Sequence, residues 1–182
     1  MPAPSKITRF EDIPQFTRGG SWECDFDLEG VLGFIQDEQK DNRLNMDPDF
    51  QRGHVWTEDQ QSRWIEFFLR GGKTGRVIYF NHPGWQSNYL GDMVIVDGKQ
   101  RCEAIRRFLG NEIKAFRSYH REYTDTLRRS GHTMRINVND LKTRAEVLQW
   151  YIEFNSGGTP HSDEEIARVG KLLVAEYKRK RQ

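Results

Sequence analysis

The chain has 182 residues, of which 36% are hydrophobic and 30% are charged. This length suits one domain with its own hydrophobic core, and the composition is that of a soluble globular protein. The formal net charge is only +1, which excludes a strongly basic domain, so any nucleic-acid binding must come from a local patch. Cys24 and Cys102 lie in no Cys-x-x-Cys or Cys/His cluster, which argues against a disulfide scaffold or a zinc site and favours a reduced, intracellular protein.

The N-terminal residues differ in character from the rest of the chain. Residues 1–20 are rich in proline and end in Gly19-Gly20, so we expect a loosely ordered lead-in followed by a single domain over residues 21–182. The lead-in has no apolar stretch of the signal-peptide kind, and no later run approaches the length of a membrane span. We therefore expect a soluble protein of the cytoplasm without membrane contacts.

The first half of the predicted domain mixes strands and helices. Alternation of apolar and polar residues over 22–26 predicts a half-buried strand, and helical spacing over 28–35 predicts a helix that two glycines weaken. Thr57 and Gln60 match a capping box at the start of a second helix. Residues 77–80 form a further predicted strand.

The second half continues the same mixture. Residues 93–96 are apolar throughout, which predicts a strand in the centre of a sheet. A helix with apolar residues up to Leu109 follows directly. A short strand near residues 136–138 and two helices, which begin near Thr143 and Ser162, complete an α/β (α+β) pattern.

The segment 97–101, Asp-Gly-Lys-Gln-Arg, lies where the predicted buried strand turns into a helix. Ligands of α/β proteins collect at the carboxyl ends of strands, and the free amides of a helix N-terminus suit a phosphate. Arg101 offers a fork of donors to phosphate oxygens, while Asp97 could hold Mg²⁺ or accept a proton, and Gly98 lets the backbone approach. Spacing alone favours a simpler interpretation in which Asp97 only caps the helix.

The segment 49–56 is the second segment whose side chains could bind a ligand. Arg52 could bind a phosphate and Trp56 could stack on a base. The alternative is that Phe50 and Trp56 belong to the core, with Trp56 packed across the cap at Thr57.

A basic run with interleaved tyrosines follows residue 116. It predicts a nucleic-acid surface, although a solvated polar face is the commoner meaning of such a run. The arginines proposed for this surface are Arg117, Arg121, Arg128 and Arg129. The histidines show no metal-ligand spacing, and no nucleophile elbow is present, which argues against zinc catalysis and a hydrolase triad.

Three segments in this order, residues 49–56, 97–101 and 154–160, resemble the ParB/sulfiredoxin-like family, which includes the N-terminal domain of GmrSD-type modification-dependent restriction enzymes. That family is marked by a Phe-Gln-Arg segment followed by tryptophan, an Asp-Gly-Gln-Gln-Arg motif, and an asparagine followed by a Thr-Pro turn and an acidic helix. The resemblance spans most of the chain. Departures from the pattern are Lys99, where the family usually has glutamine, and His161, where it usually has leucine.

The resemblance implies a ParB/sulfiredoxin-like domain, a small mixed sheet with flanking helices that binds a nucleotide and acts on phosphates. Asp97 and Arg101 would be catalytic, with Asp97 also holding Mg²⁺. The residues implied in nucleotide or phosphate binding are Gln51, Arg52, Gly98, Lys99, Gln100 and Asn155.

For function, the resemblance suggests a phage-type kinase that transfers a phosphoryl group from ATP, or another NTP, to 5-hydroxymethyluracil bases in DNA within the host cytoplasm. The alternatives are an NTPase component of a DNA modification or restriction system, with partner proteins, and a non-catalytic DNA-binding or anti-restriction module. Because related restriction proteins usually carry a nuclease or effector domain after this one, and this chain ends at Gln182, we expect no DNA cutting by this chain.

Overall fold

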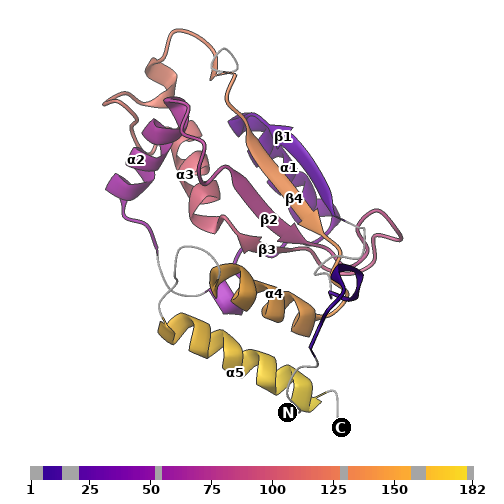
Figure 1. The fold of residues 1–182 in the computed structure, drawn as a ribbon. Coiled ribbons are helices and arrows are strands. Elements are labelled where there is room, and N and C mark those ends of the chain that lie inside the picture. The colour runs from indigo at the N-terminus through magenta and orange to yellow at the C-terminus, as the bar shows by residue number, and fades with distance from the viewer. Residues whose placement is uncertain (1–5, 14–20, 52–54, 128–130, 157–162, 180–182) are drawn as a thin grey trace.

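A computed structural model describes residues 6–13, 21–51, 55–127, 131–156 and 163–179 of the chain. These residues form one mixed sheet flanked by helices, as expected for an α+β domain (Figure 1). The elements in chain order are η1 (Phe10–Asp12), β1 (Trp22–Phe26), α1 (Leu28–Asp41), η2 (Asp49–Gln51), α2 (Glu58–Leu69), β2 (Val77–Asn81), β3 (Val94–Asp97), α3 (Lys99–Leu109), η3 (His120–Glu122), β4 (Met134–Asn139), α4 (Arg144–Ser156) and α5 (Asp163–Arg179).

The strand order is β1-β4-β2-β3, with β4 antiparallel to β1 and parallel to β2, and β2 antiparallel to β3. The prediction that residues 93–96 form a central strand is therefore wrong, because β3 lies at the edge. The strand is apolar for another reason: its two faces contribute to different cores, Ile95 to one and Val96 to the other. An isolated bridge from Asn45 to Val94 adds a partner on the outer edge of β3.

The larger core lies between one face of the sheet and the helices α1, α2 and α3. Alternate strand residues face it, because successive side chains of a strand point to opposite faces. Its buried members from the sheet are Ile78, Phe80, Ile95, Met134, Ile136 and Val138. The period-two pattern predicted for β1 and the weaker helix pattern predicted for α1 both describe residues that pack here.

The second core joins α4 and α5 to η2 and the end of β3. Phe50 is buried there, with its ring 5.2 Å from that of Tyr151 in an edge-to-face contact. The Arg168 guanidinium of α5 donates hydrogen bonds to the carbonyls of Asp49 (2.5 Å) and Phe50 (2.9 Å). The core interpretation of Phe50 is thus confirmed, and this packing holds the start of segment 49–56 beside β3.

The predicted helix starts are also confirmed where the structure describes them. Thr57 and Gln60 exchange both bonds of a capping box at α2, and Thr143 and Glu146 do the same before α4. The expected lead-in is described only over residues 6–13, so its loose order stays a prediction. Within the described residues, no helix is both long and apolar enough to cross a membrane.

Candidate nucleotide-phosphate site

The turn between β3 and α3 has a geometry that only glycine accommodates well. Gly98 is the N-cap residue of α3 and has a φ of 103°, in the left-handed region. A Cβ atom at this position would lie 3.1 Å from the two γ-carbons of Ile78. The glycine therefore allows both the backbone conformation and the close approach of the turn to β2.

Asp97 does not cap the helix. The N-cap position belongs to Gly98, and the Asp97 carboxylate instead accepts a hydrogen bond from the Arg101 guanidinium, four residues further on. Arg101 also donates to the carbonyl of Val77, at 2.7 Å. The side chains of Asp97 and Arg101 are only 27% and 13% exposed, so this acid and base are held side by side in a partly desolvated place.

One direct contact joins the segments 49–56 and 97–101, and two more join each segment to a residue near the other. The Gln51 side-chain amide donates to the carbonyl of Val96, and the Trp56 backbone N–H donates to Gln100 Oε1 at 2.9 Å. Lys99 forms an ion pair with Asp47. The two segments lie some 45 residues apart along the chain, yet they share one site in the folded protein.

The remaining residues proposed for segment 49–56 differ in what the structure describes. Arg52 lies outside the described residues. Trp56 is partly buried, with its ring 6.2 Å from that of Trp64 on α2, which fits the packing interpretation and leaves base stacking a prediction. Trp64 itself borders the site, because a Cβ atom at Gly75 would lie 3.6 Å from Trp64 Nε1 and 3.9 Å from Arg101 Nη1.

Asn155 lies in the last turn of α4 and is buried. Its side-chain amide donates to the carbonyl of Tyr151 at 2.7 Å, which is a contact within its own helix. The neighbouring Phe154 ring lies 5.0 Å from that of Tyr79 on β2. This end of α4 therefore adjoins the sheet next to Asp97, while a ligand-binding role for Asn155 stays a prediction.

A row of polar side chains crosses the sheet and ends at Asp97. Glu23 pairs with Asn137, Asn137 with Tyr79, and Tyr79 with Asp97 in the three strand ladders. Directly opposed residues share one face of a regular sheet. The β2–β3 ladder has a register shift between Tyr79 and Phe80, so the closeness of Tyr79 and Asp97 rests on their pairing and on the effect of the Asp97 charge on the Tyr79 hydroxyl. Asn137 donates to Glu23 at 3.0 Å, while its buried Oδ1 has no hydrogen-bond partner among the described residues.

Tyr79 is the member of this row nearest to Asp97. Burial raises the pKa of its hydroxyl above the ordinary value, and the Asp97 and Glu23 carboxylates raise it further, against the opposing effect of Arg101. The ring is held edge-on by Trp150, at 5.9 Å, as well as by Phe154. Sequence reasoning missed Tyr79 and Asn137, because the register that aligns them with Asp97 leaves no local signal.

The basic residues proposed for nucleic-acid binding lie elsewhere. Arg117 and Arg121 follow the C-terminal end of α3, whose 11 residues span about 16 Å, so the site at its other end is well separated from them. The guanidinium carbon of Arg121 lies 5.4 Å from the ring centroid of Tyr119. Arg128 and Arg129 lie outside the described residues.

The described residues contain no group of three or more His, Cys, Asp or Glu side chains that could hold a metal ion. Mg²⁺ is commonly bound by one or two carboxylates together with substrate phosphates. A single carboxylate such as Asp97 could therefore bind Mg²⁺ together with the phosphates of a nucleotide, but it could not form a metal site without them.

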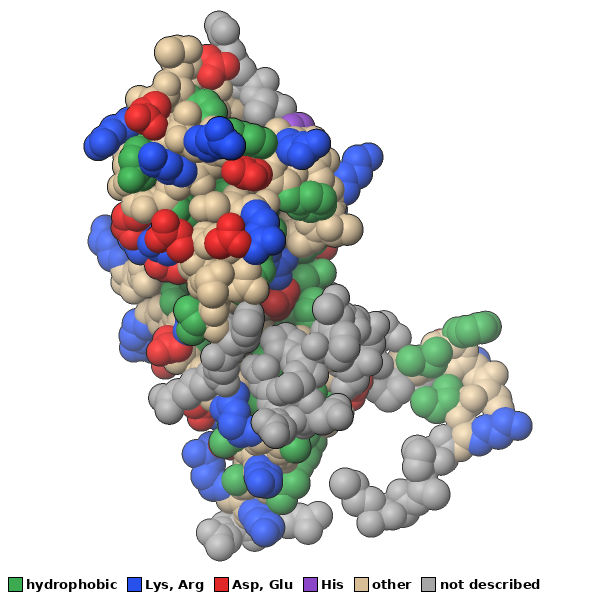
Figure 2. Space-filling model, turned by 90° about the vertical axis from the view of Figure 1, so that its left-hand side faces the viewer, with side chains coloured by type: hydrophobic (Ala, Val, Ile, Leu, Met, Phe, Trp, Pro, Cys, Tyr) green, Lys and Arg blue, Asp and Glu red, His purple; other side chains and the backbone are tan. Residues whose placement is uncertain are grey.

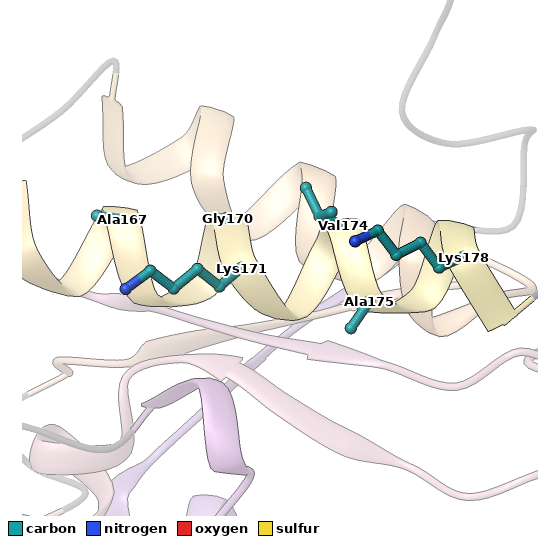
Figure 3. Close-up of a pocket in the computed structure, with 6 residues that line it drawn as sticks. All are labelled: Ala167, Gly170, Lys171, Val174, Ala175 and Lys178. Atoms are coloured by element: carbon teal, nitrogen blue, oxygen red, sulfur yellow. The ribbon is translucent and has the colours of Figure 1, made fainter.

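One hollow of about 600 Å³ lies along α5 and is unrelated to these groups. Figure 3 shows the six described residues that line it, all on α5: Ala167, Gly170, Lys171, Val174, Ala175 and Lys178. None of these six side chains is a carboxylate or an aromatic ring. We therefore place the candidate site at the β3–α3 turn.

The fold and the site together define a class: a small mixed-sheet domain with a Gly-containing strand-to-helix turn that places an aspartate and an arginine side by side. The model of the family described as "GmrSD restriction endonuclease, N-terminal domain" matches residues 31–133. The chain belongs to this family. The matched residues include the segments 49–56 and 97–101 and end before Asn155. No curated protein and no solved structure matches the chain.

Proposed function

We propose that this domain binds the phosphates of ATP, or of another nucleoside triphosphate, at the β3–α3 turn and acts on them in a DNA modification or restriction system. The observation that carries the proposal is the Asp97–Arg101 pair, 27% and 13% exposed, at the N-terminus of α3. The family description names a restriction endonuclease, which supports DNA as a partner and leaves room for partner proteins.

The electrostatics of the turn favour an anion. The first turn of α3 contains Lys99 and Arg101 and no acidic residue, although the positive end of a helix dipole disfavours cations there. Their present partners are the carboxylates of Asp47 and Asp97. A bound polyphosphate would compensate both cations and the free amides of the helix at once.

Binding of a phosphate by Arg101 would release the Asp97 carboxylate for chemistry. Asp97 could then accept the proton of an attacking hydroxyl group, whose oxygen would bond to the γ-phosphorus while the bond to the β-phosphate oxygen breaks and the nucleoside diphosphate leaves. Arg101, with Arg52 implied by the family resemblance, would neutralise the transferred phosphoryl group. Mg²⁺, bound by Asp97 and the phosphates, would supply further positive charge. The acceptor we propose is the hydroxymethyl group of 5-hydroxymethyluracil in DNA, and water acting as acceptor would give NTP hydrolysis instead.

Labelled nucleotide distinguishes these reactions. The protein is incubated with Mg²⁺ and γ-labelled ATP, and with DNA that either contains or lacks 5-hydroxymethyluracil. Label on the modified DNA supports the kinase, and label released only as free phosphate supports the NTPase. If label appears on neither, in this assay and with the other nucleoside triphosphates, both enzymatic proposals are wrong.

The chain offers a matched control for the role of Asp97. Asp59 pairs with Arg63 at the same four-residue spacing on α2, but the Asp59 side chain is 71% exposed. We expect Asp97→Asn to lower phosphate transfer or release by roughly 100-fold or more, and Asp59→Asn to leave it unchanged. Circular dichroism checks that both variants fold. An active Asp97→Asn variant would contradict the catalytic assignment.

A second candidate function is a non-catalytic module that senses DNA or nucleotide, or that blocks restriction. It is favoured by the fact that Gln51, Lys99 and Gln100 are all engaged in contacts within the protein. Under this hypothesis, Asp97→Ala preserves DNA or partner binding in a pull-down, and no nucleotide is turned over.

A further inference from the structure

The segment after α3 contains a hairpin turn with unusual residues. Ala115 and Ser118 exchange two backbone hydrogen bonds of 3.0 Å each, which closes a loop of two residues. Those residues, Phe116 and Arg117, have φ angles of 50° and 67°. Positive φ at both central positions defines a type I′ turn, for which Asn-Gly is the preferred sequence.

Phe-Arg is a costly choice for this turn, because bulky side chains strongly disfavour the left-handed region. Neighbouring groups hold the conformation nevertheless. The Phe116 N–H donates to Glu66 Oε1 on α2 at 2.7 Å, and the Tyr123 hydroxyl donates to the Ala115 carbonyl at 2.7 Å. Backbone strain that the surroundings maintain is typical of functional positions.

The turn presents an aromatic ring to solvent in a basic neighbourhood. Phe116 is 46% exposed and Arg117 is exposed. Close by, Lys114 Nζ and the Arg121 guanidinium lie 4.7 and 5.4 Å from the ring centroid of Tyr119. We call Lys114, Phe116, Arg117, Tyr119 and Arg121 the turn patch.

The cations of the turn patch are available to a ligand. Among the described residues, none of the three forms an ion pair, whereas Glu66 and Glu122 accept hydrogen bonds from backbone amides of the patch. Figure 2 shows a face of the molecule on which acidic, basic and hydrophobic side chains are interspersed. Because the formal net charge of the chain is only +1, the positive charge of the turn patch is a local feature.

We propose that the turn patch is a nucleic-acid contact in which Phe116 stacks on a base and Lys114, Arg117 and Arg121 bind phosphates. An exposed ring beside unpaired cations matches the two components of such binding, stacking and phosphate neutralisation. The alternative ligand is an acidic protein partner. Such a partner would bind the cations, but it would not require an aromatic ring fixed at the tip of a strained turn. The choice of DNA as the nucleic acid rests on the proposed function.

Binding of fluorescently labelled DNA tests this proposal. We measure anisotropy with single-stranded and duplex oligonucleotides for the wild type, Phe116→Ala and Tyr89→Ala. Tyr89 is a matched control, because it is also an exposed aromatic residue with positive φ, in the loop between β2 and β3. Phe116→Ala is expected to weaken binding roughly tenfold, while Tyr89→Ala leaves it unchanged.

A 2-aminopurine base in the oligonucleotide reports stacking directly. Its fluorescence is expected to change on binding the wild type and to change less with Phe116→Ala. Arg117→Ala should reduce the slope of log affinity against log salt by about 1. Equal affinities and equal 2-aminopurine signals for the wild type and Phe116→Ala would overturn the proposal.

The backbone strain at Phe116 and Arg117 allows a second test, in which stability and DNA binding should change in opposite directions. Replacing Phe116 and Arg117 by Asn and Gly should raise the melting temperature, because Asn-Gly suits the turn, and should weaken DNA binding at the same time. If the melting temperature rises and DNA binding is unchanged, Phe116 and Arg117 have no role in binding.

The two proposals can fail separately. If DNA binding depends on Phe116 but the protein neither binds nor turns over nucleotide, the turn-patch proposal is supported and the nucleotide-phosphate proposal is wrong. Nucleotide turnover that is lost in Asp97→Asn, together with DNA binding that is indifferent to Phe116, would do the reverse.

Discussion

At the scale of single residues, the structure gives Asp97 a different role from the one that its position in the sequence favours. An aspartate between a strand and a helix usually caps the helix, but here Gly98 occupies the cap position and the carboxylate turns toward Arg101. Capping requires only local geometry, whereas the observed pair also needs the Val77 carbonyl of β2 to orient the guanidinium. The residue that makes this arrangement possible is Gly98.

Gly98→Ala should therefore destabilise the protein. A Cβ atom at a φ of 103° is strained, and it would press on Ile78, so we expect a loss of about 1–3 kcal/mol in the free energy of unfolding. Urea titration measures this loss. The control is Gly33→Ala in α1, where a Cβ atom meets nothing within 4 Å, and where alanine should add about 0.5–1 kcal/mol.

At the scale of elements, α2 links stability to the site. Its capping box at Thr57 and Gln60 directly follows Trp56, whose N–H donates to Gln100 in α3. The helix start thus anchors the end of segment 49–56 next to the β3–α3 turn. A local signal that was readable in the sequence has a consequence across the fold.

Thr57→Ala removes the capping oxygen and should lower the free energy of unfolding by about 1 kcal/mol. We also expect weaker nucleotide binding, because the backbone at Trp56 becomes less well held. Scanning calorimetry measures the loss of stability, and titration calorimetry measures nucleotide binding. Ser62→Ala, in the middle of α2, serves as the control: it should leave nucleotide binding unchanged and should not lower the free energy of unfolding, because alanine favours the helix. Unaltered stability in Thr57→Ala would show that the box is dispensable.

At the scale of the whole molecule, burial couples the fold to pH through His82. This side chain is fully buried after β2, where its Nδ1 accepts a hydrogen bond from the Gly84 N–H at 3.1 Å. Burial lowers the pKa of the imidazole below its ordinary value of 6.5, against the opposing effects of nearby backbone groups and Asp92. The folded protein therefore binds a proton at His82 less readily than the unfolded chain does.

The sign of the pH dependence follows from this difference. The stabilisation by neutral His82 is complete above pH 6.5, the pKa of the unfolded form, and it is lost as the pH falls below that value. The slope contributed by this one group is at most about 1.4 kcal/mol per pH unit. Urea midpoints between pH 7.5 and pH 5 should decline for the wild type and decline less for His82→Gln. Equal declines would assign the effect to other groups.

The sequence by itself determined the kinds of element and most of their starts, because periodicity and capping depend on residues within one or two turns of each other. It also marked the segments 49–56 and 97–101, since their residue types are suited to phosphate chemistry. The strand order was not readable from the sequence. β4 lies inside the sheet although its sequence showed only a faint strand pattern, and β3 lies at the edge although residues 93–96 are apolar throughout.

Only the tertiary structure decided which side chains meet at Asp97. Strand register aligned Tyr79, Asn137 and Glu23 with it, and long-range hydrogen bonds joined Gln51 and Trp56 to the same turn. Register depends on how whole faces of a sheet are buried, and a shift of one residue would send every side chain to the opposite face. That choice is made by the packing of the two cores, so it cannot be read from the spacing of residues along any single strand.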